Sequence, residues 1–207
     1  MHITFKQTLE DFKQDLARRL TLEGKAINFW SVLSIITSKG VTSVLLYRLK
    51  RYFYYKNNLI LKSAVRLLKF PEFHYCHNEL DPRAIIAPGL VLSDMGGVSL
   101  GFSVIIGKNC TFMGKATPTL GAMEGIDLMN DRIRIGDYCV IGHNVKVINP
   151  VTIADGVQIK PNSVLMTSVK ESGTIIAGFP AKSVGIVPMT LIKSWSPILS
   201  QTLAMSH

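Results

Sequence analysis

Histidines are the side chains of this sequence whose chemistry is easiest to place. His143 stands in "VIGHNV", and His74 and His77 stand in "EFHYCHN". An imidazole with a pKa of about 6.5 accepts a proton at neutral pH, so each could serve as a general base. The alternative is an exposed turn histidine at 143 and a structural pair, spaced by three near a linker, at 74 and 77. The residues alone leave both interpretations open.

Cysteine usage excludes two kinds of site. Cys76, Cys110 and Cys139 show no paired spacing such as C-x-x-C, which a metal site would need. Their odd number argues against a disulfide framework, so we expect a reducing compartment and no bound metal.

A six-residue repeat must position these side chains. Four residues after most members of the repeat, the side chain is small or β-branched, as at Cys110 and Cys139. The members fall into three phased runs: Leu80, Ile86, Leu92; then Leu100, Ile106, Phe112; then Ile135, Ile141, Val147, Ile153, Ile159, Leu165.

A period of six excludes the ordinary elements. A helix needs apolar residues three and four apart, and a strand of a sandwich alternates by two. A coil with three short flat faces, each made of one hexapeptide, points one aliphatic residue per face inward and stacks on the next coil at about 4.8 Å. The repeat therefore predicts a parallel β-helix, and its inward positions argue against Cys110 or Cys139 as a nucleophile.

Composition and charge divide the 207 residues into three parts. We expect a basic amphipathic helical region at 1–72, the β-helix at 73–187 and a C-terminal tail at 188–207. The start, "MHITFKQTLEDFKQDLARRL", mixes charges with apolar residues at helical spacing, which indicates a helix of the mature protein and not a signal peptide.

The whole net charge of +9 arises between Gly24 and Pro71, where nine Lys and Arg residues stand with no acid. The longest uncharged run there, Ala26 to Ser38, is shorter than the roughly 20 apolar residues that span a bilayer. Bases and aromatics along apolar helices fit an anionic membrane surface, so residues 24–71 predict a cytoplasmic protein at the inner face of the membrane. The alternative is a helical cap whose bases stay solvated. No nucleic-acid motif accompanies the charge.

The repeat resembles the left-handed β-helix acyltransferases, and within them the serine acetyltransferase-like branch that includes members of capsule and exopolysaccharide gene sets. The resemblance covers residues 71–187, and "LLYRLKRYF" is similar to the helical lead-in of those capsule members. The ending "AGFPAKSV" is similar to the family's G-x-P-A-[KR]-x-[VI] signature, which packs against coenzyme A. The resemblance implies acetyl-coenzyme A as co-substrate, no metal, and a homotrimer with sites between neighbouring coils.

The same resemblance implies where catalysis would occur. The family's Asp-Ile-His-Pro is "ELDP" here, with Glu79 at the carboxylate, and its Gly-x-x-Leu-Asp-His becomes "GLVLSD", with Asp94 at the histidine. After the loop "KATPTLGAMEGIDLMN", the family's Arg-His-Pro-Lys-Ile is "DRIRI", so its three histidines are absent. Asp94, with Glu79 as helper, is then one candidate base. His143, beside the coenzyme A groove, is either a relocated base or a groove-lining residue.

Coenzyme A contacts are also implied by position. Arg134, Lys160 and Lys182 would offer charge to its phosphates. The alternative is that each lysine is a solvated corner and that "FPAKS" simply ends the last coil. The residues that would line the groove are Gly142, His143, Lys160, Pro161, Ala181 and Lys182.

These arguments predict an O-acetyltransferase that acts on a sugar hydroxyl in surface polysaccharide synthesis. Two alternatives stay open: a non-catalytic homologue that serves as a trimeric scaffold or regulator, and a serine acetyltransferase-like enzyme with a relocated base.

Overall fold

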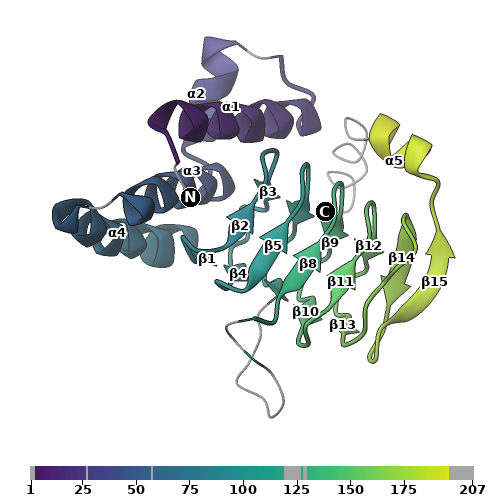
Figure 1. The fold of residues 1–207 in the computed structure, drawn as a ribbon. Helices are drawn as coiled ribbons and strands as arrows, with labels where there is room; N and C mark the ends of the chain where they lie inside the picture. The colour runs from purple at the N-terminus through teal and green to yellow at the C-terminus, as the bar shows by residue number, and fades with distance from the viewer. Residues whose placement is uncertain (1–2, 27, 57, 119–126, 128–129, 196–207) are drawn as a thin grey trace.

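A helical region precedes a stack of short strands in the computed structural model, which describes residues 3–26, 28–56, 58–118, 127 and 130–195 (Figure 1). Thr4 and Asn28 cap the first two helices by accepting hydrogen bonds from the backbone N–H groups of Gln7 and Ser31. The predicted N-terminal helix is confirmed. The helices are α1 (Phe5–Leu22), α2 (Phe29–Ile36), α3 (Lys39–Tyr55) and α4 (Leu59–Pro71), followed by a π-helical turn (Glu72–Cys76).

The strands form three parallel faces, as the repeat predicts. The first face holds β1 (Glu79–Leu80), β4 (Ser99–Leu100), β7 (Thr117–Pro118), β10 (Lys146–Val147) and β13 (Val164–Leu165). The second holds β2 (Ile85–Ile86), β5 (Val104–Ile106), β8 (Ile133–Ile135) and β11 (Thr152–Ile153). The third holds β3 (Val91–Leu92), β6 (Thr111–Phe112), β9 (Val140–Ile141), β12 (Gln158–Ile159) and β14 (Thr174–Ala177), and β15 (Lys182–Ile186) closes it antiparallel.

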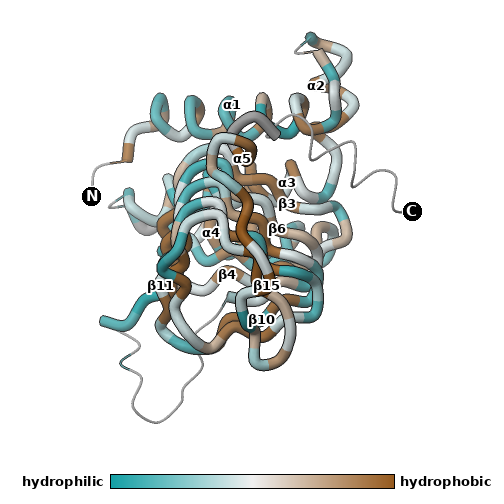
Figure 2. The backbone as a smooth tube through the Cα atoms, turned by 90° about the vertical axis from the view of Figure 1, so that its right-hand side faces the viewer, coloured by the Kyte–Doolittle hydropathy of each residue, from teal (hydrophilic) through white to brown (hydrophobic). Residues whose placement is uncertain are grey.

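The core is the interior of this stack, and Figure 2 looks along it. Every member of the six-residue repeat is buried, and so are the small residues four positions later, Cys110 and Cys139 among them. Inward side chains of successive coils lie against one another, which keeps apolar area out of water along the stack. The parallel β-helix and its register are confirmed.

Side chains of α3 close the open edge of the first coil. The Tyr47 hydroxyl donates to the carbonyl of Ala84 (2.9 Å), and Arg48 donates to the carbonyls of Ile86 (2.8 Å) and Ala87 (3.0 Å). The Lys50 ammonium donates to the carbonyl of Leu80 (2.6 Å), and Arg51 donates to those of Pro82 and Ala84. No earlier coil exists to supply these donors, and buried carbonyls without partners are costly. The cap therefore replaces the missing coil.

This cap corrects part of the charge interpretation. Arg48, Lys50 and Arg51 are at most 8% exposed. For these three bases, contact with a membrane surface is a wrong prediction, and so is solvation on the outside of a cap. Their charge is used to bind backbone oxygens.

Two carboxylates compensate the buried cations. Asp15 of α1 accepts two hydrogen bonds from Arg48 (2.9 and 3.1 Å) and one each from the backbone N–H groups of Gly89 and Leu90. Lys50 forms an ion pair with Glu72, and burial lowers the pKa of this lysine and raises the pKa of this glutamate. The helical region and the first coil thus share one polar, buried interface.

The β-helix begins after the π-helical turn and ends with β15. The expected boundary between residues 72 and 73 falls inside the π-helical turn, and β15 ends at Ile186. In the predicted tail, α5 (Met189–Trp195) packs Met189 and Ile192 against Gly156. Within the described ranges, no single helix is long and apolar enough to cross a membrane; by length and composition, α2 and α3 pass that test only jointly, as a pair bent by 86°.

Candidate functional site

The corner between the third and first faces, here called the third corner, stacks polar residues along the β-helix. The backbone N–H of Lys115 donates to the carbonyl of Gly96 (2.9 Å), Asn144 to Gly114 (3.0 Å), and Asn162 to His143 (2.8 Å). Each step is one coil, or about 4.8 Å. Residues with a positive φ, which Gly and Asn adopt most readily, recur along this corner: His77, Gly96, Gly97, Lys115, Asn144 and Asn162.

His143 lies half-buried in the middle of this corner, directly after β9. A Cβ atom added to Gly114, one coil earlier, would lie 3.6 Å from His143 Nδ1 and 2.8 Å from the Cβ of Met95. Glycine at 114 therefore permits the close approach of Met95, while the imidazole of His143 lies at ordinary contact distance from this position. Among the described residues, no hydrogen bond engages the ring of His143, so its nitrogens are available to a substrate.

The predicted groove residues follow one another along the same corner. The N–H of Gly142 donates to the carbonyl of Ile159 (2.9 Å), and a Cβ at Gly142 would lie 2.7 Å from the backbone nitrogen of Pro161. Only a glycine permits this close approach between the two coils. Gly142 and Pro161 therefore form adjacent rungs, as the positions predicted.

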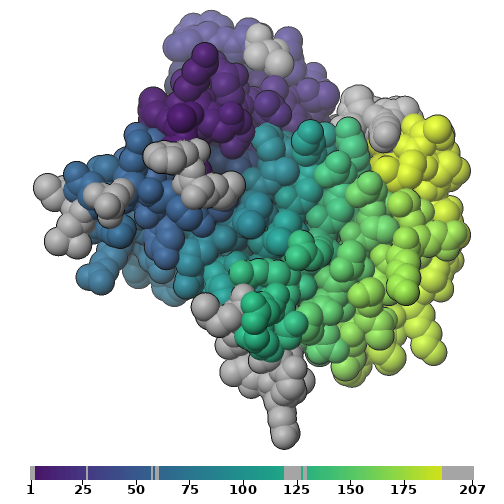
Figure 3. All heavy atoms as spheres, viewed as in Figure 1, coloured from purple at the N-terminus to yellow at the C-terminus, as the bar shows by residue number. Residues whose placement is uncertain are grey.

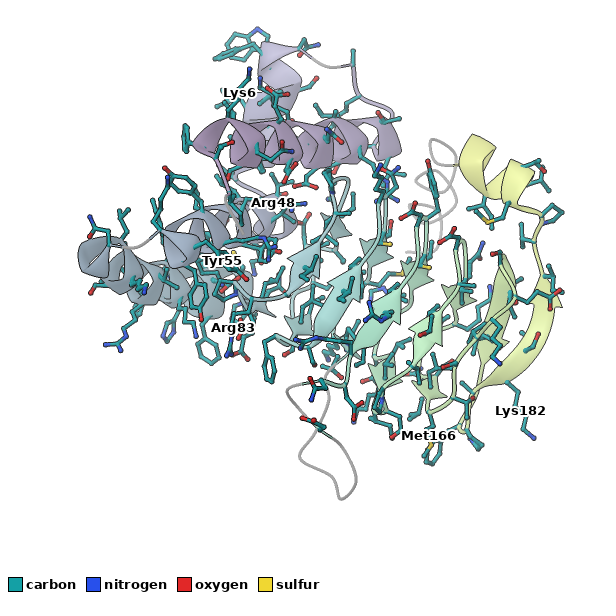
Figure 4. All side chains as sticks on the ribbon, viewed as in Figure 1. Lys6, Arg48, Tyr55, Arg83, Met166 and Lys182 are labelled. Carbon is teal, nitrogen blue, oxygen red and sulfur yellow. The ribbon has the colours of Figure 1, made fainter. Side chains whose placement is uncertain are left out.

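Lysines give the corner its charge. Lys160 follows β12, and Lys182 lies opposite Ala177 of β14, where Ala181 donates its N–H to the carbonyl of Val164 (3.0 Å). Both lysines are exposed, and neither has an ion-pair partner among the described residues; Figure 4 shows Lys182 pointing away from the end of the stack. No acid stands in residues 113–116, 142–145, 160–163 or 177–182. A corner of this charge suits an anionic ligand.

Arg134 does not join these lysines within one chain. It lies in β8, between Ile105 and Thr152 on the second face. In a three-sided coil the second face is opposite the third corner, so the single chain keeps Arg134 away from Lys160 and Lys182.

Asp94 is already engaged by the helical region. Its Oδ2 accepts from Arg19 Nη2 (2.9 Å), and its Oδ1 accepts from the backbone N–H of Gly40 (2.7 Å). Both carboxylate oxygens are therefore already occupied by donors from the helical region. Catalysis by Asp94 stays a prediction, and these bonds weigh against it.

Glu79 lies too far along the stack to assist His143. It begins β1, which is three strands before β10 on the first face, in the order β1, β4, β7, β10. Three steps correspond to about 14 Å. The carboxylates of Glu79 and Asp94 also have no contact with each other; the bonds of Asp94 go to Arg19 and Gly40.

The other candidates have structural surroundings. The ring of His74 stacks on Phe70, with centroids 4.4 Å apart, whereas His77 is exposed at the start of the third corner. All three cysteines are buried and free, and burial raises the pKa of the Cys76 thiol to about 11. No three His, Cys, Asp or Glu side chains of the described chain come together in a way that could hold a metal ion.

Lys115 also lies at this corner, although it is not among the predicted groove residues. It precedes the break in the repeat and lies one coil before Asn144, which in turn precedes Asn162 by one coil. The sequence contains a signal for this position: "GK", "HN" and "PN" stand at the same distance after the inward residues Phe112, Ile141 and Ile159. Most of the loop "KATPTLGAMEGIDLMN", namely residues 119–126 and 128–129, lies outside the described residues.

Comparisons with known proteins agree with this architecture. Residues 132–166 match the family model "Bacterial transferase hexapeptide (six repeats)". A serine acetyltransferase of Staphylococcus xylosus is 31% identical over 170 residues, covering 82% of this chain and 70% of that protein. One of Helicobacter pylori is 28% identical over 180 residues, covering 84% and 96%.

Solved structures share the fold. The crystal structure of serine acetyltransferase from Neisseria gonorrhoeae superposes with a TM-score of 0.77 at 20% identity, covering 92% of this chain and 72% of that one. The enzyme from Brucella abortus, in complex with coenzyme A, gives a TM-score of 0.76 at 18% identity, covering 89% and 70%. These likenesses make the stack a left-handed β-helix.

Proposed function

The chain belongs to the hexapeptide-repeat transferase family and is an acyltransferase, and from this premise we propose that it transfers the acetyl group of acetyl-coenzyme A to a sugar hydroxyl in surface polysaccharide synthesis. The observation that carries the proposal is the third corner. There the imidazole of His143, which has no hydrogen bond within the described chain, lies near Lys160 and beside Gly142, where adjacent coils pack closely. Serine acetyltransferase relatives at 28% and 31% identity support acetyl-coenzyme A as the donor.

His143 is the base in this mechanism. Its neutral imidazole accepts the proton of the acceptor hydroxyl while the oxygen attacks the thioester carbon. The carbon–sulfur bond then breaks, and the proton passes from the imidazolium to the departing sulfur of coenzyme A. The protein's other contribution is to hold the two reactants in contact at one corner.

Lys160 and Lys182 would bind the phosphates of coenzyme A through charge-assisted hydrogen bonds. The rungs of Gly142 and Pro161 offer the flat backbone along which a narrow pantetheine chain can lie. Ala181, beside Lys182 at the closing turn, would contact the nucleotide end. In a homotrimer whose sites lie between the β-helices of neighbouring subunits, the Arg134 guanidinium would approach this corner from an adjacent subunit.

The acceptor is proposed on separate grounds from the donor. Support for a sugar comes from the absence of the three serine acetyltransferase histidines, with Asp94 at one of their positions, and from the capsule-like helical lead-in. Free serine is the second candidate, because the curated relatives carry that name. We also propose a cytoplasmic location at the inner face of the membrane.

Release of coenzyme A thiol from acetyl-coenzyme A, in the presence of sugars or of serine, tests the mechanism. We expect His143→Ala to lower kcat by roughly 100-fold or more while calorimetric binding of coenzyme A persists. His74→Ala, the same change at an exposed histidine outside the third corner, is the matched control and should retain turnover. Full activity of His143→Ala, or its loss in Asp94→Asn alone, would refute His143 as base. Turnover with serine above that with every sugar would replace the sugar acceptor.

A further inference from the structure

The outer face of α4 is an exposed surface of one charge sign. Leu67 and Phe70 are 75% and 67% exposed, and Phe73 in the following turn is 65% exposed. Val65, on the opposite side, is buried against the rest of the helical region. Figures 1 and 3 show α4 at the edge of the molecule, away from the stack of coils. We call Lys62, Arg66, Leu67, Lys69, Phe70 and Phe73 the α4 face.

The spacing of these residues makes two parallel stripes. Lys62, Arg66 and Lys69 are four and three residues apart, so they lie along one line of the helix. Leu67 and Phe70 are three apart and form the neighbouring line. Helix α4 therefore buries one apolar side against the rest of the protein and exposes a second apolar line, flanked by bases, to solvent.

These bases form no ion pairs within the described chain. The sequence of α4 contains no Asp or Glu, and within the part of the chain that the structure describes, no carboxylate is at ion-pair distance from Lys62, Arg66 or Lys69. In α3, Arg48, Lys50 and Arg51 bind backbone oxygens, and Lys39 lies over the ring of Tyr75. The α4 bases have no such partner among the described residues and can meet an external anion.

We propose that the α4 face docks on the surface of an anionic lipid bilayer. Leu67, Phe70 and Phe73 would insert at the level of the headgroups, and the three bases would bind lipid phosphates. The inference names the contact for the proposed peripheral location, but it is independent of the transfer reaction, which can be measured without lipid.

Charge favours this partner over a second copy of the chain. A twofold contact through the α4 face would place Arg66 near its own equivalent, with no acid of α4 to separate the two charges. Helix α2 exposes Phe29 and Trp30 at 72% and 75%, but it carries no base. The α4 face combines three bases that lack an ion-pair partner with exposed Leu67 and Phe70, whereas α1 exposes Phe5 and Leu9 beside only one such base, Lys6.

Co-sedimentation with vesicles tests the proposal. We would compare phosphatidylcholine vesicles with vesicles containing 30% phosphatidylglycerol, about a third anionic lipid, at low and high salt. The wild-type protein should bind the anionic vesicles and be released by salt. Lys62→Glu/Arg66→Glu/Lys69→Glu should weaken binding by roughly 100-fold or more, since each base contributes about a fivefold factor.

Matched variants distinguish vesicle binding by the α4 face from binding through net charge alone and from binding through α2. Lys6→Glu/Lys108→Glu/Lys170→Glu changes net charge equally at exposed positions elsewhere and should retain most binding. Leu67→Ser/Phe70→Ser should weaken binding, whereas Phe29→Ser/Trp30→Ser should not. The proposal is refuted if wild-type protein stays in the supernatant at low salt, if the two charge reversals act alike, or if only the α2 variant loses binding.

Two controls accompany the vesicle experiment, one for folding and one for the third corner. Circular dichroism must show that the α4 variants fold, and calorimetric titration with coenzyme A must show an intact third corner. Lipid-independent self-association that Leu67→Ser/Phe70→Ser abolishes, measured by light scattering, would assign the face to a second copy and overturn the membrane partner. Loss of coenzyme A binding in the wild type would fault the proposed reaction and leave the vesicle result unchanged.

Discussion

Helices α3 and α4 carry the same kind of charge and use it in opposite ways. Both contain Lys and Arg among apolar residues, and neither contains an acid. In α3, Arg48, Lys50 and Arg51 are buried against the first coil, whereas Lys62, Arg66 and Lys69 of α4 are exposed. The same composition therefore serves as a structural cap in one helix and as a free surface in the next.

The difference comes from what lies opposite each helix. The open edge of the first coil presents carbonyl oxygens of Leu80, Ala84, Ile86 and Ala87, and α3 packs on it. Oxygens of the backbone need donors, and long basic side chains reach them across a helix–coil interface. Helix α4 packs mainly on α3 and the π-helical turn, which offer no such row of acceptors.

The largest effect is expected from Arg48→Met. This change leaves the Asp15 carboxylate buried without its guanidinium partner and removes the donor to the carbonyls of Ile86 and Ala87. We expect the free energy of unfolding to fall by about 4–5 kcal/mol. Urea denaturation followed by circular dichroism, at matched protein concentration, measures it.

Arg48→Lys is the conservative variant for that experiment. A lysine keeps the charge but lacks the planar fork that reaches Asp15 and two carbonyls together. Most of the loss should remain. A change below about 1 kcal/mol in both variants would show that the cap does not depend on Arg48, and the contrast with α4 would weaken.

Lys50 should give the next largest effect. Lys50→Met leaves Glu72 buried and unpaired, and we expect a loss of about 3 kcal/mol. Adding Glu72→Gln removes the stranded charge and should restore at least about 1 kcal/mol of it. Additive losses in the double variant, from the same urea titration, would show that the two residues act separately.

The sequence predicted the stack better than it predicted the cap. The period of six identifies inward residues such as Ile135 and Ile141 directly, because every coil repeats the same environment. The cap has no repeat. Its signal was a helical stripe in which Tyr47, Arg48 and Arg51 continue the apolar line of Val41 and Val44, which indicates that these bases face inward.

The site was predictable to a similar, partial extent. Gly142, Pro161 and Lys160 could be assigned to neighbouring rungs because they recur with the repeat. The engagement of Asp94 could not, since its partners Arg19 and Gly40 lie 75 and 54 residues away in the chain. Arg134 was grouped with the lysines because of its charge, whereas its place in the repeat puts it on another face.

The smallest effect on the free energy of unfolding is expected from the three bases of α4. Lys62→Ala, Arg66→Ala and Lys69→Ala should each change the free energy of unfolding by no more than about 0.5 kcal/mol, because these side chains are exposed and alanine favours a helix. The urea titration used for Arg48→Met gives the value directly. A loss comparable to that of Arg48→Met would mean that α4 is also a structural cap, and reduced vesicle binding after charge reversal would then report unfolding. Unchanged stability would leave the α4 bases without a structural role, which is the condition for their binding an external surface.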